Sequence, residues 1–155
     1  MKQEPILLSA RVRHPVSLIA VFLWIGFVCS ISFMEAWLKF RAPGVSLALG
    51  LGIGRLVFAA LNKAEWVFAL LIALHLLIAD DRLLKWRNLL YLLPLGLLTA
   101  QSAWLLPALD ARAGLYMEGR QVPPSGLHFY YVGMEVLKVL SLFFFGVTHF
   151  RRYRS

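Results

Sequence analysis

Residues 15–38 read PVSLIAVFLWIGFVCSISFMEAWL, an apolar run whose only charged residue is Glu35. A helix needs about 20 apolar residues to cross a bilayer, at about 1.5 Å of rise per residue. This run therefore predicts a transmembrane helix. A basic segment precedes it, as in a signal peptide, but the run is too long for a signal peptide and no small-residue cleavage site follows it. We interpret it as a retained signal anchor.

Three further apolar runs predict three more spans, at about residues 56–79, 88–107 and 127–150. Before the second span lies a glycine-rich piece, Leu47 to Gly54, for which we expect a short interfacial or re-entrant segment. A polar loop from Asp110 to Ser125 precedes the fourth span. The sequence thus predicts an all-α, polytopic membrane protein: one domain, residues 1–155, formed by a four-transmembrane-helix bundle.

The composition supports a membrane protein and argues against nucleic-acid binding. Hydrophobic residues make up 60% of the 155 residues and charged residues 15%, whereas soluble domains average about 45–50% and about 25%. The formal net charge is +8, but most basic residues punctuate apolar runs instead of clustering on one face, as they would in a nucleic-acid-binding protein. A single cysteine, Cys29, excludes an intramolecular disulfide.

The distribution of Lys and Arg predicts the orientation, because cytoplasmic loops carry an excess of them. With both termini inside, the outer side carries Lys39, Arg41, Arg55, Arg112 and Arg120. The inner side then carries the larger set: Lys2, Arg11, Arg13, Arg82, Lys85, Arg87, Arg151, Arg152 and Arg154. We therefore predict a multi-pass protein of the cell membrane, the inner membrane of a two-membrane cell, with both termini cytoplasmic.

Polar and ionisable residues inside the spans are the candidate site. Each ionisable side chain costs roughly 2.5–3.5 kcal/mol to insert and marks a functional site by default. Counting about 1.5 Å per residue from the outer interface puts them all in the outer half of the bilayer. The candidate ligand-binding residues are Glu35, Lys39, Asn62, Glu65, Gln101, Glu135 and Lys138.

Their spacing predicts how the bilayer tolerates them. Glu35 and Lys39 are four residues apart, and Glu135 and Lys138 are three apart, so each couple lies on one helix face. Asn62 and Glu65 likewise share a face, while Lys63 points elsewhere and snorkels outward. A lone carboxylate in hydrocarbon is too costly. We therefore expect Glu65 and Glu135 to face one shared cavity.

These residues favour the binding or transport of a lipid or small molecule in a polar, carboxylate-containing pocket. Three alternatives stay open. The ion pairs could only lock helix packing. A membrane enzyme could use Glu35, Glu65 or Glu135 as general acid or base on an amphipathic substrate. The chain could also be an accessory subunit of a membrane complex. The expected partners are membrane lipid, a small-molecule ligand, and a homo-oligomeric or membrane-complex partner.

No motif assigns a catalytic residue or a cofactor. The sequence lacks GxGxxG, GxSxG, HExxH and P-loop patterns. His75 and His149 lie at similar depth near the inner side and could ligate haem or a metal ion. No further Cys or His nearby completes a zinc set. We expect interfacial histidines that cap carbonyl groups, with no metal and no cofactor.

Three segments carry a resemblance to a known family. They are Leu38-Lys39-Phe40-Arg41-Ala42-Pro43, Gly54-Arg55-Leu56-Val57-Phe58, and the polar-faced stretch from Glu135 to Ser141. Their order is similar to that in a family of small four-helix membrane proteins of unknown function, related to the transmembrane proteins associated with platinum-drug resistance. That family tends to have His where this chain has Glu135. The resemblance implies a four-helix fold but no reaction or substrate.

Overall fold

The computed structural model describes residues 11–12, 14–79 and 86–151. Four helical rods form it, and each is long and apolar enough to cross a membrane: Pro15–Arg41, Leu47–Ile78, Leu89–Met117 and Leu127–Val147. The predicted all-α class with four transmembrane helices is confirmed. The remaining regular structure of the described residues is one short antiparallel pair of strands, β1 (Arg11–Val12) and β2 (Phe150–Arg151).

Two rods are composite and two are single α-helices. The first rod consists of α1 (Pro15–Val28), a π-helical segment (Cys29–Glu35), α2 (Ala36–Leu38) and a 3-10 turn (Lys39–Arg41). The second is α3 (Leu47–Ile78). The third consists of α4 (Trp86–Ala100), a second π-helical segment (Gln101–Leu105) and α5 (Leu106–Met117). The fourth is α6 (Leu127–Val147).

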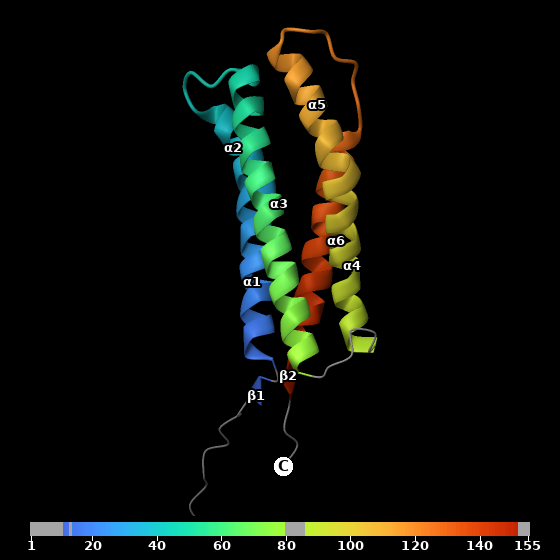
Figure 1. The fold of residues 1–155 in the computed structure, drawn as a ribbon. Helices are drawn as coiled ribbons and strands as arrows, with labels where there is room; N and C mark the ends of the chain where they lie inside the picture. Colours follow the sequence, from blue (N-terminus) through green and yellow to red (C-terminus); the bar gives the residue numbers. More distant parts are fainter. Residues whose placement is uncertain (1–10, 13, 80–85, 152–155) are drawn as a thin grey trace, which may run out of the picture.

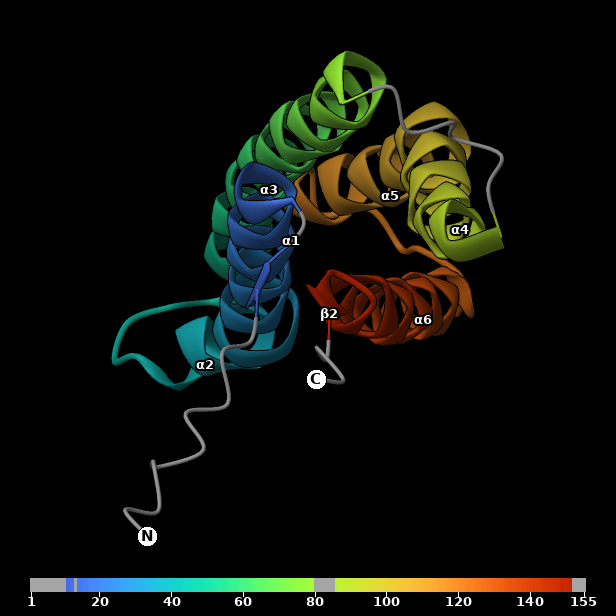
Figure 2. The same cartoon turned by 90° about the horizontal axis from the view of Figure 1, so that it is seen from below.

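The rods stand side by side, with β1 and β2 at one end of the bundle and α2 and α5 toward the other (Figure 1). We call these the terminal end and the distal end. Viewed along the bundle, α1 lies beside α3, and α4 lies beside α6 (Figure 2). Additional contacts join α1 to α6 and α3 to α5. The pairing of β1 with β2 places Arg11 and Arg151, the first and last described residues, on the same side of the bundle.

Apolar side chains fill the interior and also cover the outside. Fully buried core residues come from all four rods and include Trp24, Leu61, Ile72, Leu98, Leu142 and Phe145. The Tyr91 hydroxyl donates a hydrogen bond to the Ala69 carbonyl at 2.6 Å, which satisfies a polar atom inside this core. Large apolar side chains such as Leu70 and Phe144 are exposed on the outer faces. Lipid is the solvent in which such faces are stable.

The glycine-rich piece is the beginning of α3 and not a separate segment, so the second helix begins earlier than the predicted span. The helix begins at Leu47, where the Ser46 hydroxyl accepts a hydrogen bond from the Leu49 amide at 3.3 Å. Glycines usually weaken a helix. Here they allow close packing, because a Cβ on Gly50 would overlap the Phe40 ring.

The third rod also runs further than predicted. We expected it to end near Pro107, with a loop starting at Asp110, but the helix continues to Met117. A proline within a helix removes one backbone donor and collides with the preceding turn. Pro107 falls in the first turn of α5, directly after the second π-helical segment, whose wider turn has already changed the hydrogen-bond pattern. The proline therefore does not terminate the rod.

Candidate functional site

Five polar side chains form a buried cluster in the middle of the bundle: Trp24, Glu65, Gln101, Glu135 and Lys138. The Lys138 ammonium lies at its centre. It donates to Glu65 Oε1 at 2.5 Å and to Glu135 Oε1 at 3.1 Å. The side chains of all three charged residues are at most 1% exposed. One cation thus serves two carboxylates out of contact with solvent.

Two neutral donors complete the cluster, so that each of the four rods contributes. Trp24 Nε1 donates to Glu65 Oε1 at 2.8 Å, and Gln101 Nε2 donates to Glu135 Oε1 at 3.0 Å. Two oxygens, Glu135 Oε2 and Gln101 Oε1, are buried without a hydrogen-bond partner among the described residues.

The buried cluster constrains how the helices pack. A charge inside a protein is tolerated only when its partners are in place, and removing one partner of a buried ion pair costs about 3–5 kcal/mol. Because the partners here come from different rods, a shift of one rod along its neighbours would separate a charge from its counter-ion. The buried cluster therefore fixes the relative heights of the four rods.

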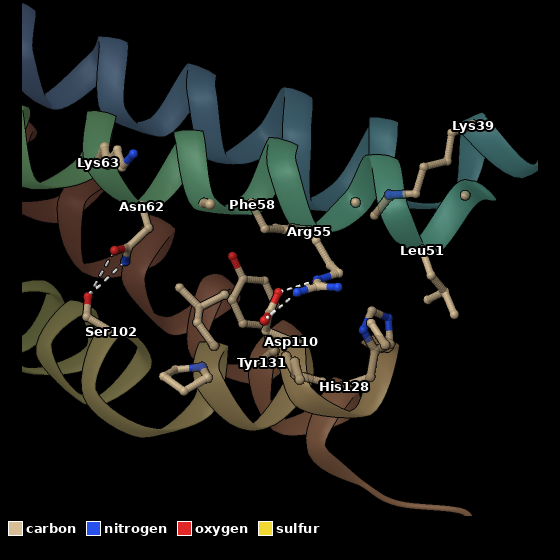
Figure 3. A pocket seen from close by; sticks show the side chains of 18 of the residues that line it. Lys39, Leu51, Arg55, Phe58, Asn62, Lys63, Ser102, Asp110, His128 and Tyr131 are labelled. Atoms are coloured by element: carbon tan, nitrogen blue, oxygen red, sulfur yellow. Dashed lines mark hydrogen bonds and ion pairs between the residues drawn. The ribbon is translucent and has the colours of Figure 1, made fainter. Parts of the chain in front are cut away.

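A cavity of about 550 Å³ lies toward the distal end, and Figure 3 shows the side chains that line it. We call it the distal pocket. It is lined by α2, the 3-10 turn after it, α3, the third rod from Ser102 onward, and the start of α6. Its walls are mostly apolar and include Phe58, Leu106 and Pro107.

The inner end of the distal pocket is polar and satisfied by its own hydrogen bonds. Asn62 Nδ2 donates to Ser102 Oγ at 2.8 Å, and Trp66 Nε1 donates to the same oxygen at 3.0 Å. Asn62, Ser102 and Tyr131 line the pocket, and each is within four residues of a member of the buried cluster on its own rod. The pocket and the cluster are therefore neighbours.

An ion pair reaches across the pocket between Asn62 on one side and Lys39 on the other, and we call the part from this pair to Lys39 the mouth (Figure 3). Arg55 on α3 binds Asp110 on α5 through two parallel bonds, Nε to Oδ1 at 2.5 Å and Nη2 to Oδ2 at 2.8 Å. Such a bidentate arrangement fixes the orientation of the guanidinium group. Its third nitrogen, Nη1, contacts the Met117 sulfur at 3.9 Å.

A second cation lies at the same mouth. Lys39 Nζ donates to Glu35 Oε2 at 3.2 Å and lies 5.3 Å from the centroid of the Phe58 ring. A Cβ on Gly54 would come within 2.9 Å of this ammonium group, so the glycine leaves room for it. His128 on α6 also lines the mouth (Figure 3).

The structure divides the seven predicted site residues into two groups. Glu65, Gln101, Glu135 and Lys138 belong to the buried cluster, whereas Lys39 and Asn62 line the distal pocket; Glu35 pairs with Lys39 but is not a lining residue. Both predicted same-face ion pairs form, and Lys63 is exposed as expected.

Glu65 and Glu135 do lie together, as predicted. The cavity is nevertheless beside them and not around them, because Lys138 fills the space between the two carboxylates. Neither carboxylate lines the distal pocket, so the expected shared cavity differs from the cavity that the structure has.

Sequence reasoning missed several partners. Trp24 lies nine residues inside the predicted span 15–38 without a charged neighbour to mark it, and Ser102 carries no signal of its own beyond following Gln101 in the chain. The Arg55–Asp110 pair was missed because Asp110 was expected in a loop. A helix continued through Pro107 would have placed Asp110 on a face that α3 can reach.

Three histidines gather at the terminal end. The His14 ring centroid lies 5.4 Å from that of His75 and 5.5 Å from that of His149. His149 bonds through Nδ1 to the Phe145 carbonyl at 2.9 Å, which confirms the predicted capping role for this residue. Within the described ranges, no three His, Cys, Asp or Glu side chains are arranged to hold a metal ion. The absence of a metal or cofactor stays a prediction.

No known protein family, curated protein or solved structure matches this chain. The resemblance to the family related to the platinum-resistance-associated transmembrane proteins therefore stays a prediction.

Proposed function

We propose that this membrane protein holds one amphipathic molecule, a lipid or a small molecule, in the distal pocket, either to bind it or to pass it on. The observation that carries the proposal is a cavity of about 550 Å³ with apolar walls and polar groups at both its mouth and its inner end. Ligand pockets in proteins typically enclose about 300–1,000 Å³ and combine mostly apolar walls with a few placed polar groups.

We place both termini in the cytoplasm and hence the distal pocket in the outer half of the cell membrane. The support is the larger number of Lys and Arg residues at the ends of the chain and in the loop between α3 and α4. An amphiphile in the outer leaflet would then reach the mouth between α3 and α5 without crossing the bilayer.

Catalysis by a buried carboxylate draws less support. Glu65 and Glu135 are enclosed in the buried cluster, and Glu35 does not line the pocket. A general acid or base must come within hydrogen-bond reach of the reacting group.

The exposed apolar faces of the bundle can contact either lipid or a partner helix, so they favour no particular assembly.

Filling the pocket tests the proposal. Ala59 lines the pocket, whereas the adjacent Ala60, which is also exposed, does not. We expect Ala59→Phe to lose most of the ligand that co-purifies with the wild-type protein in mild detergent, measured by native mass spectrometry. Ala60→Phe adds the same ring to the same helix and should keep that ligand.

Both variants should elute as the wild type does in gel filtration. A folded Ala59→Phe variant with its full ligand content would place the ligand elsewhere. A wild-type protein that carries no amphiphile and takes none up from mixed micelles would refute the proposal.

A further inference from the structure

We infer that the distal pocket selects an anionic amphiphile, with its acidic head group at the mouth beside Arg55 and Lys39 and its apolar chain against the inner walls. The inference rests on the proposed function and names the class of ligand.

The charges around the pocket favour an anion. Three cations are among its lining residues, Lys39, Arg55 and Lys63, against one carboxylate, Asp110, but the exposed Lys63 side chain points away from the other two cations (Figure 3). Glu35, which pairs with Lys39 from outside the lining, brings the carboxylates to two. Lys39 and Arg55 are thus balanced by two carboxylates, and the one cation in excess is Lys63, which forms no ion pair within the described part of the chain. In a site with apolar walls such an excess attracts and orients a negative group.

The donors at the mouth are only partly used. Arg55 donates from Nε and Nη2 to Asp110, while Nη1 contacts only the Met117 thioether, a weak acceptor. The Lys39 ammonium carries three N–H groups and gives one to Glu35. Carboxylate and phosphate oxygens are the acceptors that suit both cations. A head group placed between them would complete both sets of bonds.

The rest of the pocket suits the apolar part of the same ligand. Inward from the mouth, the Phe58 and Tyr131 rings meet edge to face at 5.3 Å between centroids, and Leu106 adds an aliphatic wall. At the inner end, Asn62 and Ser102 already bond to each other. They therefore have less need of a ligand oxygen, which places the acidic group at the mouth.

A purely structural role for the ion pair at the mouth makes a different prediction. If Arg55 and Asp110 only tie α3 to α5, Arg55→Gln and Asp110→Asn break the same contact and should affect binding in the same direction. If Arg55 binds an anion, the two changes have opposite signs. Arg55→Gln removes the receiving cation, while Asp110→Asn removes the carboxylate that competes for it.

The test is a titration of the full-length protein in non-ionic detergent, followed by native mass spectrometry. The probes are phosphatidylglycerol, phosphatidylcholine, an alkyltrimethylammonium amphiphile and inorganic phosphate. We expect phosphatidylglycerol to bind about tenfold more tightly than phosphatidylcholine, and the cationic amphiphile to bind least. Arg55→Gln and Lys39→Gln should each weaken phosphatidylglycerol binding about tenfold, the usual loss for one hydrogen bond to a charged group. Asp110→Asn should strengthen it severalfold.

Arg120→Gln is the matched control. Arg120 is a cation at the same end of the bundle, paired with Glu118 and absent from the pocket lining. Its removal should leave phosphatidylglycerol affinity unchanged. If Arg55→Gln fails to fold, Lys39→Gln and Asp110→Asn still provide the opposite signs.

The possible outcomes distinguish a failure of the anion selectivity from a failure of the proposed amphiphile binding. Equal affinity for phosphatidylglycerol and phosphatidylcholine would overturn the anion selectivity and leave the pocket function standing. Weakening by Arg55→Gln and Asp110→Asn alike would assign the ion pair to helix packing. Inorganic phosphate that binds as tightly as the lipid would overturn the role of the apolar walls. Failure of every amphiphile to bind would refute the proposed function itself.

Discussion

At the scale of single residues, Lys138 has the most demanding position in the protein. Its ammonium is fully buried and is the one cation within hydrogen-bond distance of both Glu65 and Glu135 among the described residues. Lys138→Met keeps a long, unbranched side chain but leaves two carboxylates without their counter-ion. We expect a loss of about 3–5 kcal/mol in the free energy of unfolding. Thermal unfolding in detergent, followed by circular dichroism, measures it, and a Met variant as stable as the wild type would contradict this account.

Glu135→Gln is the milder change at the same place. It keeps the shape of the side chain and an oxygen for Gln101 and Lys138, and the Lys138–Glu65 ion pair persists. We expect a smaller loss of stability than in Lys138→Met. Because Glu135 does not line the distal pocket, the ligand content should stay that of the wild type. A well-folded Glu135→Gln protein without ligand would show that the binding site extends into the buried cluster.

At the scale of elements, two glycines within helices should respond oppositely to the same substitution. Gly50 on α3 packs against the Phe40 ring, where a methyl group has no room, whereas a methyl group on Gly133 of α6 would meet no neighbouring side chain within 4 Å. Alanine is the better helix former by about 0.8–1 kcal/mol. Gly133→Ala should therefore raise the unfolding temperature, whereas Gly50→Ala should lower it by displacing Phe40. Thermal unfolding of the two variants side by side tests this, and a stabilised Gly50→Ala would contradict the close packing.

The helices themselves could be predicted from the sequence, but their ends could not. An apolar run such as residues 15–38 has few alternatives to a membrane-spanning helix. The glycines before Arg55 and the proline at position 107 are typical signals of a helix end, and both are overridden. Packing of Phe40 on Gly50 compensates the low helix propensity of the glycines, and the π-helical segment before Pro107 accommodates the proline. Both compensations depend on contacts or backbone geometry that local propensity does not encode.

At the scale of the whole molecule, the orientation in the membrane is directly testable. Gln121 lies exposed in the connection between α5 and α6 at the distal end, whereas β2 lies at the opposite end and precedes Arg154 in the sequence by three residues. With Cys29 replaced, Gln121→Cys should react with a membrane-impermeant maleimide in intact cells, because we place the distal end outside. Arg154→Cys should react only after the cells are opened. The reverse labelling pattern would put the distal pocket on the cytoplasmic side.

The candidate site could be predicted only in part, again for a reason that belongs to the whole molecule. The cost of charges in hydrocarbon indicates that Glu65, Glu135 and Lys138 must meet, and they do. It does not indicate where space is left over. The distal pocket depends on how α3 and α5 lie relative to each other, and that arrangement is fixed by contacts such as Arg55–Asp110 across 55 positions of the chain.

The length of α3 creates a hydrophobic mismatch. Its 32 residues measure about 48 Å. A hydrocarbon layer about 30 Å thick encloses only about 39 Å of a helix tilted by about 40°, near the limit of observed tilts. At least one turn of α3 must therefore stand clear of the acyl chains, and the charged pair Arg55–Asp110 marks the distal end as the part that does. The distal end of α3 thus lies not in hydrocarbon but at the level of the lipid head groups, where a water-soluble reagent can reach it.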